Sequence, residues 1–201
     1  MSVKTPLEML YYWEKTTPDA VYLRQPIDGV FHDFTWAQVG DQVRRIANAL
    51  IAQNFEQGSH IAILSKNCAE WFITDLAIMM AGHVSVPIYF TAGQETIRYV
   101  LAHSNCKAIF IGKLDDTEHQ CAAIDSHITR FAMPYGDIPA RYQWPELLQQ
   151  PPLASSPVPD ASDTMTIIYT SGSTGNPKGV VNTFGSYGWS WQALAPDLKV
   201  G

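Results

Sequence analysis

Two kinds of hydrophobic pattern alternate along most of the chain. Short, continuous apolar runs occupy residues 60–65, 84–90, 107–112, 128–133 and 165–170. The segments between most of these runs carry apolar residues at every third or fourth position, which is typical of helices with one buried face. Strands that are buried on both faces and separated by helices indicate a parallel sheet. The pattern therefore predicts an α/β fold in which helices cover both faces of a parallel sheet.

Capping and turn signals place the individual elements. Capping boxes at 5–8 and 35–38 each predict the start of a helix, the first with a proline in its first turn. Strands at 21–24 and 30–34 are separated by the Asp-Gly pair at 28–29, which favours a tight hairpin turn. Further helices are expected at residues 68–81, 95–104 and, more weakly, 116–126.

A change of composition near residue 150 divides the chain. Residues 149–162 contain four prolines and little bulk, which is typical of a linker or a long surface crossing. We therefore expect an α/β subdomain over 1–150 and a linker rich in proline and serine over 151–162. The start of a second α/β subdomain, which would carry the segment described below, is expected over 163–201.

Composition and charge exclude several classes of function. The chain has 201 residues, a formal charge of −6 and no basic cluster, so nucleic acid is not an expected partner. The most apolar stretch, 71–90, contains Asp75 and Pro87 and changes its period midway, which favours a buried helix and strand over a transmembrane segment. Peripheral association with a membrane stays open. Three scattered cysteines, with no signal peptide at the N-terminus, predict a cytoplasmic protein with reduced thiols.

The segment "YTSGSTGNPKGVV" (169–181) carries the strongest candidate chemistry. Glycines at 172, 175 and 179 allow the backbone to turn through positive φ and to approach a ligand closely. Backbone N–H groups in such a turn bind anions, the hydroxyl side chains add donors, and Lys178 adds a positive charge. The common P-loop has Ser or Thr after its lysine, whereas Gly179 follows here. We interpret the segment as a polyphosphate-binding loop; the alternative is a flexible hairpin between two strands.

This segment resembles the phosphate-loop signature of the adenylate-forming superfamily, which includes acyl-CoA synthetases, luciferases and peptide-synthetase adenylation domains. Three more segments are similar to the first third of fatty-acyl-CoA synthetases: "FTWAQVGDQVRRIANAL" (34–50), "HIAILSKNCAEWFITDLAIMMAGHVSVPIY" (60–89) and "YVLAHSNCKAIFIG" (99–112). The resemblance implies an enzyme that uses ATP and Mg²⁺ to activate a carboxylic acid as an acyl-adenylate. It also implies transfer of the acyl group to CoA, with medium- to long-chain fatty acids as the substrates.

The resemblance implies in addition which residues hold the β- and γ-phosphates of ATP. They are the matching positions Thr170, Ser171, Gly172, Ser173, Thr174, Gly175 and Lys178. Lys178 is the expected catalytic residue, and the expected contribution of the group is positioning and charge neutralisation. The chain departs from the family pattern shortly after the loop, where a histidine is common and this sequence has Asn182 and Phe184.

Three interpretations stay open at this point. Later signatures of the superfamily, such as a Tyr-Gly-x-Thr-Glu stretch and a C-terminal lysine, do not occur in the sequence. The chain is therefore expected to be the N-terminal portion of an acyl-CoA synthetase. The second interpretation is a truncated fragment that is inactive alone and binds at most nucleotide phosphates. The third is a phosphotransferase or NTPase, which the absence of a hydroxyl after Lys178 disfavours.

Other candidate side chains have an ordinary structural explanation beside the functional one. An aromatic group follows the loop and consists of Phe184, Tyr187, Trp189 and Trp191. It suits a pocket for the carboxylate substrate and the packing of a helix beginning near residue 184 equally well. The pairs His103–Cys106 and His119–Cys121 lack the spacing of a metal site, and no metal ligand is predicted.

Overall fold

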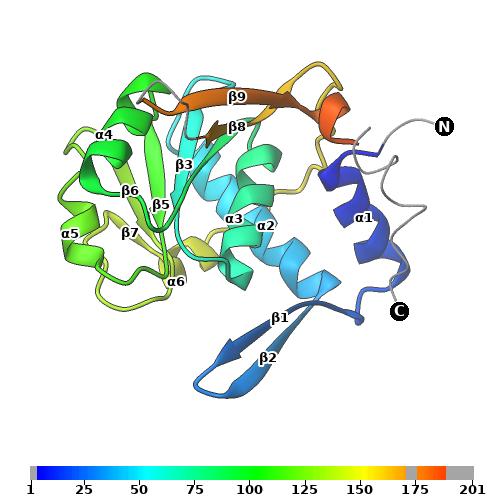
Figure 1. Cartoon of the computed structure of the whole chain (residues 1–201). Helices are drawn as coiled ribbons and strands as arrows, with labels where there is room; N and C mark the ends of the chain where they lie inside the picture. Colours follow the sequence, from blue (N-terminus) through cyan, green and yellow to red (C-terminus); the bar gives the residue numbers. More distant parts are fainter. Residues whose placement is uncertain (1–3, 171–175, 189–201) are drawn as a thin grey trace.

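The computed structural model describes residues 4–170 and 176–188, and a mixed sheet forms its centre (Figure 1). The seven strands lie in the order β7 (Tyr142–Gln143), β6 (Thr129–Ala132), β5 (Ala108–Ile111), β3 (His60–Leu64), β4 (Val84–Ile88), β8 (Thr164–Thr170) and β9 (Lys178–Thr183). Every neighbouring pair from β7 to β8 is parallel, whereas β9 runs antiparallel to β8. The predicted α/β fold is confirmed, with one antiparallel strand added to the parallel sheet.

Helices cover both faces of the sheet, as the hydrophobic pattern predicts. The side chains of one face pack with α1 (Pro6–Thr16), α2 (Trp36–Ile51), α3 (Ala69–Met80) and α6 (Trp144–Leu148). Those of the other face pack with α4 (Gln94–His103) and α5 (Thr117–Cys121). In the first cluster the fully buried rings of Phe110 and Phe131 stack with their centroids 4.7 Å apart. The sheet is therefore packed between two separate apolar clusters, one on each face.

The local signals act as expected at the N-terminus. Both capping boxes are formed, with the Thr5 and Thr35 hydroxyls accepting from the backbone N–H three residues later. The strands β1 (Val21–Ile27) and β2 (Val30–Thr35) form a two-stranded hairpin apart from the main sheet. Asp28 and Gly29 turn between them with φ of 50° and 80°, so the turn uses the left-handed region that this pair tolerates.

The proline-rich segment crosses the surface of α2. Arg45 Nη1 donates to the carbonyl of Gln150 at 2.9 Å, Asn48 Nδ2 to that of Pro151 at 3.0 Å, and Arg44 Nη2 to Ser156 Oγ at 3.2 Å. After this crossing, β8 joins the same sheet as the earlier strands, through its pairing with β4. The division into subdomains at residue 163 stays a prediction.

The structure contains two elements that the sequence pattern does not predict. The strand β7 and the helix α6 occupy 142–148, ahead of the proline-rich segment. Conversely, the helix expected over 116–126 is confined to α5. Within the described ranges, no helix combines the length and the apolar character that crossing a membrane requires.

Candidate functional site

The segment with the candidate phosphate-binding residues connects β8 to β9 as a hairpin. Thr170, the last residue of β8, is the cross-strand partner of Lys178, the first residue of β9. Both are exposed. A hydroxyl and an ammonium group therefore stand opposite each other where the two strands meet the connection. The other predicted phosphate contacts lie outside the described residues: Ser171, Gly172, Ser173, Thr174 and Gly175.

Thr170 and Lys178, the described ends of the hairpin, lie at the carboxyl edge of the parallel sheet. Since β8 is parallel to β4, Thr170 ends β8 at the same edge at which Ile88 and Leu64 end β4 and β3. Ligands of open α/β sheets bind at this edge. A hairpin is also the geometry of the alternative interpretation, so connection type alone does not separate the two. The position at this edge, with Lys178 exposed, is what an anion-binding role needs.

Gly179 corrects one expectation. The sequence assigned it to a turn with positive φ, but it lies in the extended strand β9, and positive φ is found elsewhere among the described glycines. A Cβ at this position would lie 3.0 Å from Ile167 Cγ2 and 3.2 Å from Tyr169 Cζ. Glycine therefore avoids a close contact here, because the side chains of β8 lie beside it and would have to move by a few tenths of an ångström to admit a Cβ.

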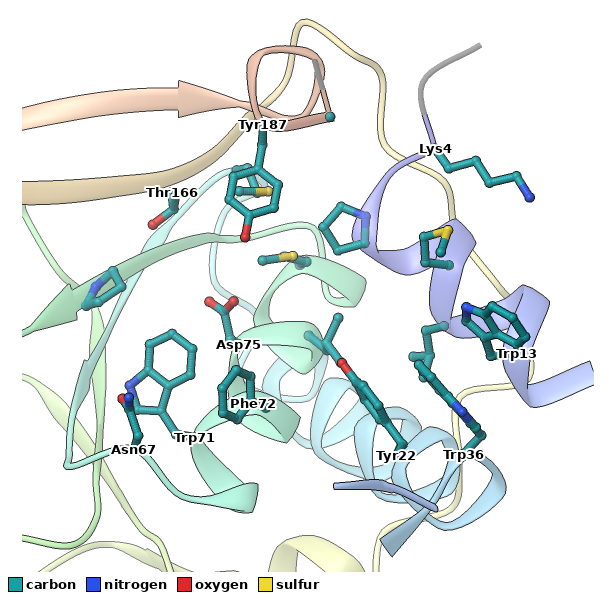
Figure 2. Close-up of a pocket in the computed structure, with 18 of the residues that line it drawn as sticks. Lys4, Trp13, Tyr22, Trp36, Asn67, Trp71, Phe72, Asp75, Thr166 and Tyr187 are labelled. Atoms are coloured by element: carbon teal, nitrogen blue, oxygen red, sulfur yellow. The ribbon is translucent and has the colours of Figure 1, made fainter. Parts of the chain in front are cut away.

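A cavity of about 1160 Å³ lies between α1, α3, β8 and the segment after β9 (Figure 2). Its walls are mainly apolar and aromatic, and they include Tyr22, Trp36, Trp71, Phe72 and Tyr187. Phe72 projects from α3, is 40% exposed and belongs to the cavity wall. The sequence gives no local signal for the cavity, because its walls come from both ends of the chain.

Asp75 is the acidic residue of this cavity. It projects from α3, and Figure 2 shows its carboxylate directed toward the Tyr187 hydroxyl and above the Phe72 ring. Burial raises the pKa of Asp75 to about 6, and the neighbouring Ser85 hydroxyl offsets part of the rise. The same carboxylate contributes to the raised pKa of Tyr22, for which burial is the larger cause. The cavity therefore disfavours negative charge.

The remaining candidate residues separate into core and surface. Phe184 is 3% exposed and packs in the core, whereas Tyr187 is exposed and lines the cavity; Trp189 and Trp191 lie outside the described residues. Asn182 Nδ2 donates to the carbonyl of Val180, within the same strand.

The histidine and cysteine pairs do not form metal sites in the described part of the chain. Cys106 Sγ lies 3.1 Å from Ser104 Oγ, and His119 Nδ1 lies 3.3 Å from Gln94 Nε2. No group of three side chains from His, Cys, Asp and Glu gathers there around a possible ion. His103 instead contacts Tyr169 at the base of the hairpin, a contact that the sequence did not indicate.

The fold and the position of the hairpin agree with the family assignment. The chain belongs to the AMP-binding enzyme family, whose model matches residues 10–199. A long-chain-fatty-acid–CoA ligase of Mycobacterium bovis is 33% identical over 189 residues, which cover 85% of this chain and 30% of the relative. A crotonobetaine/carnitine–CoA ligase of Citrobacter koseri is 29% identical over 194 residues, 85% of this chain and 35% of the relative.

Solved structures support the same fold. A benzoate CoA ligase of Burkholderia xenovorans matches with a TM-score of 0.77 and 18% identity, over 96% of this chain and 37% of its own. The N-terminal subdomain of a Klebsiella oxytoca protein matches with a TM-score of 0.70 and 22% identity, over 92% of this chain and 43% of its own. The chain thus spans about a third of the two relatives named above, 30% and 35%.

Proposed function

We propose that this chain is the phosphate-binding N-terminal portion of an ATP-dependent acyl-CoA synthetase. The observation that carries the proposal is the pairing of Thr170 with Lys178 at the carboxyl edge of the sheet, in a member of the AMP-binding family. An exposed hydroxyl and an exposed ammonium group beside a glycine-rich connection suit the triphosphate of ATP. The relative from Mycobacterium bovis, a long-chain-fatty-acid–CoA ligase, supports medium- to long-chain fatty acids as the substrates and CoA as the acceptor.

In this proposal the hairpin orients the β- and γ-phosphates so that pyrophosphate can leave when the carboxylate attacks the α-phosphate. Lys178 offsets the negative charge that accumulates on the leaving pyrophosphate, and Thr170 donates a hydrogen bond. Ser171, Gly172, Ser173, Thr174 and Gly175 are proposed to complete the contacts. Mg²⁺ would accompany the phosphates of ATP. We further propose a cytoplasmic location, which the three free and buried cysteines support.

A phosphotransferase or NTPase activity is the weaker candidate, because Gly179 follows Lys178 where such enzymes place a magnesium-binding hydroxyl. A phosphate-binding hairpin does not by itself orient a carboxylate for attack. We therefore expect the 201-residue chain to bind triphosphates without forming acyl-adenylate.

The experiment is a calorimetric titration of the 201-residue chain with MgATP and with inorganic tripolyphosphate. Lys178→Ala should weaken the binding of both ligands about tenfold or more, because a charge-assisted hydrogen bond is worth roughly 1.5 to 3 kcal/mol. Lys107→Ala is the matched control, since Lys107 is also exposed but precedes β5 at the opposite, amino edge of the sheet. Equal losses in both variants would refute a specific role of Lys178. Hydroxamate-trapped acyl product from the wild-type chain, lost in Lys178→Ala, would refute the expected inactivity.

A further inference from the structure

The base of the hairpin is attached to α4 through one buried side chain. Tyr169 precedes Thr170 in β8 and is 6% exposed. Its hydroxyl lies 2.7 Å from Nδ1 of His103, the last residue of α4. The two residues are 66 positions apart in the sequence. This hydrogen bond therefore ties the hairpin to α4, a helix that packs on one face of the sheet.

The Tyr169 ring lies between His103 on one side and Gly179 on the other. The His103 ring meets it edge-on, with centroids 5.7 Å apart and an interplanar angle of 88°. Tyr99, one turn earlier on α4, stacks on His103 with centroids 5.2 Å apart and so fixes the imidazole. On the side of β9, the absence of a side chain at Gly179 leaves space for the ring. Tyr169 is thus held between α4 and β9.

The alternation of side chains along β8 relates this contact to the candidate site. Ile167 and Tyr169 face the α4 side, whereas Thr166 and Ile168 line the cavity on the opposite side. Thr170 therefore belongs to the face opposite Tyr169, and Lys178, its cross-strand partner, shares that face. Fixing the Tyr169 ring determines where the hydroxyl and the ammonium group stand on the other side of the strand pair.

We propose that His103 is a positioning residue for the phosphate-binding hairpin, which it holds in register through the Tyr169 hydroxyl. The inference rests on the proposed function, which assigns phosphate binding to the hairpin. Binding then depends on how Thr170 and Lys178 are placed. Removing the imidazole leaves the Tyr169 hydroxyl without this partner in a confined site. The ring then shifts, and the pair formed by Thr170 and Lys178 moves with it.

The test compares variants of the 201-residue chain by calorimetric titration with inorganic tripolyphosphate, together with their unfolding midpoints. His103→Ala and Tyr169→Phe should each weaken binding about two- to tenfold, the range expected for one hydrogen bond. The double variant should bind no more weakly than the weaker single variant, because both changes remove the same interaction. His103→Asn should restore affinity to within about twofold, since its amide places a hydrogen-bonding atom near the position of Nδ1.

The outcomes separate this inference from the proposed function. His127→Ala, at an exposed histidine between α5 and β6, controls for the loss of a histidine as such. If Lys178→Ala loses binding while His103→Ala binds like the wild type, the positioning role is refuted and the proposed function stands. If His103→Asn binds as weakly as His103→Ala, the hydrogen bond is not the cause and the inference fails. If the wild-type chain does not bind tripolyphosphate, both proposals fail.

Discussion

The stability of Asp75 variants tests quantitatively whether the cavity disfavours a negative charge. The change is Asp75→Asn, which keeps the shape of the side chain and removes its charge. Burial raises the pKa of this carboxyl group from 3.8 to about 6, so the folded state holds the proton more tightly than the unfolded chain does. The group therefore stabilises the fold below about pH 4, and this stabilisation is lost as the pH rises from about 4 to about 6.

The expected change in the free energy of unfolding follows from how far the pKa of Asp75 is raised. At about 1.4 kcal/mol for each pKa unit, the charged carboxylate would cost at most about 3 kcal/mol above pH 6. Asp75 is half-buried and faces an open cavity, so water screens part of this cost. We expect Asp75→Asn to raise the free energy of unfolding by about 1 to 2 kcal/mol at pH 8. The gain should shrink steadily below pH 6 and nearly vanish near pH 4.

The assay is urea unfolding followed by tryptophan fluorescence at several pH values between 4 and 8. Asp125→Asn, at an exposed position after α5, is the control and should have little effect at any pH. A gain in Asp75→Asn that does not depend on pH would show that charge is not the cause. A variant less stable than the wild type at pH 8 would refute the reasoning, because it would mean that the cavity favours the carboxylate.

Three further predictions concern buried contacts. Gln25 Oε1 accepts from the Ala69 N–H at the start of α3, at 3.1 Å, so Gln25→Ala should lower the free energy of unfolding by about 1 to 3 kcal/mol in urea titrations. Gly179→Ala should lower the free energy of unfolding by about 1 kcal/mol in the same assay, since its Cβ would lie 3.2 Å from Cζ of Tyr169, whose ring is packed against His103 and cannot easily move aside. Burial raises the pKa of the Cys106 thiol to about 11; mass spectrometry should therefore find it unmodified by iodoacetamide at pH 8 until the chain is unfolded.

Much of the fold could be predicted because its signals are local. The capping boxes at residues 5–8 and 35–38, the Asp-Gly turn and the alternation of apolar runs with helical spacing each need only a short window of sequence. The strand β7 could not be predicted in this way, because its two residues are too few to show a hydrophobic period. The favoured interpretation assigns the start of β9 to a loop, since lysine and glycine are typical of loops, whereas the alternative of a hairpin between two strands places a strand here.

The candidate site was predictable to a smaller extent. The pairing of Thr170 with Lys178 brings together two of the residues that the sequence predicts to bind phosphate, and their role stays a prediction. The prediction that Gly179 provides positive φ is wrong. The space beside Gly179 is limited by side chains of β8, and its backbone is extended. The contact of His103 with Tyr169 and the environment of Asp75 depend on residues far apart in the chain, and a single sequence does not report such distances.

The antiparallel strand β9 has a dynamic consequence. In the described structure it is the edge strand beside β8, and the parallel strands continue on the far side of β8 as far as β7 at the other edge. An outer strand can detach in a local opening without disturbing the strands beneath it. Amide deuterium exchange along 178–183 should therefore be faster than in β3 and β5. A bound triphosphate would slow exchange in this strand first, leaving the centre of the sheet unchanged.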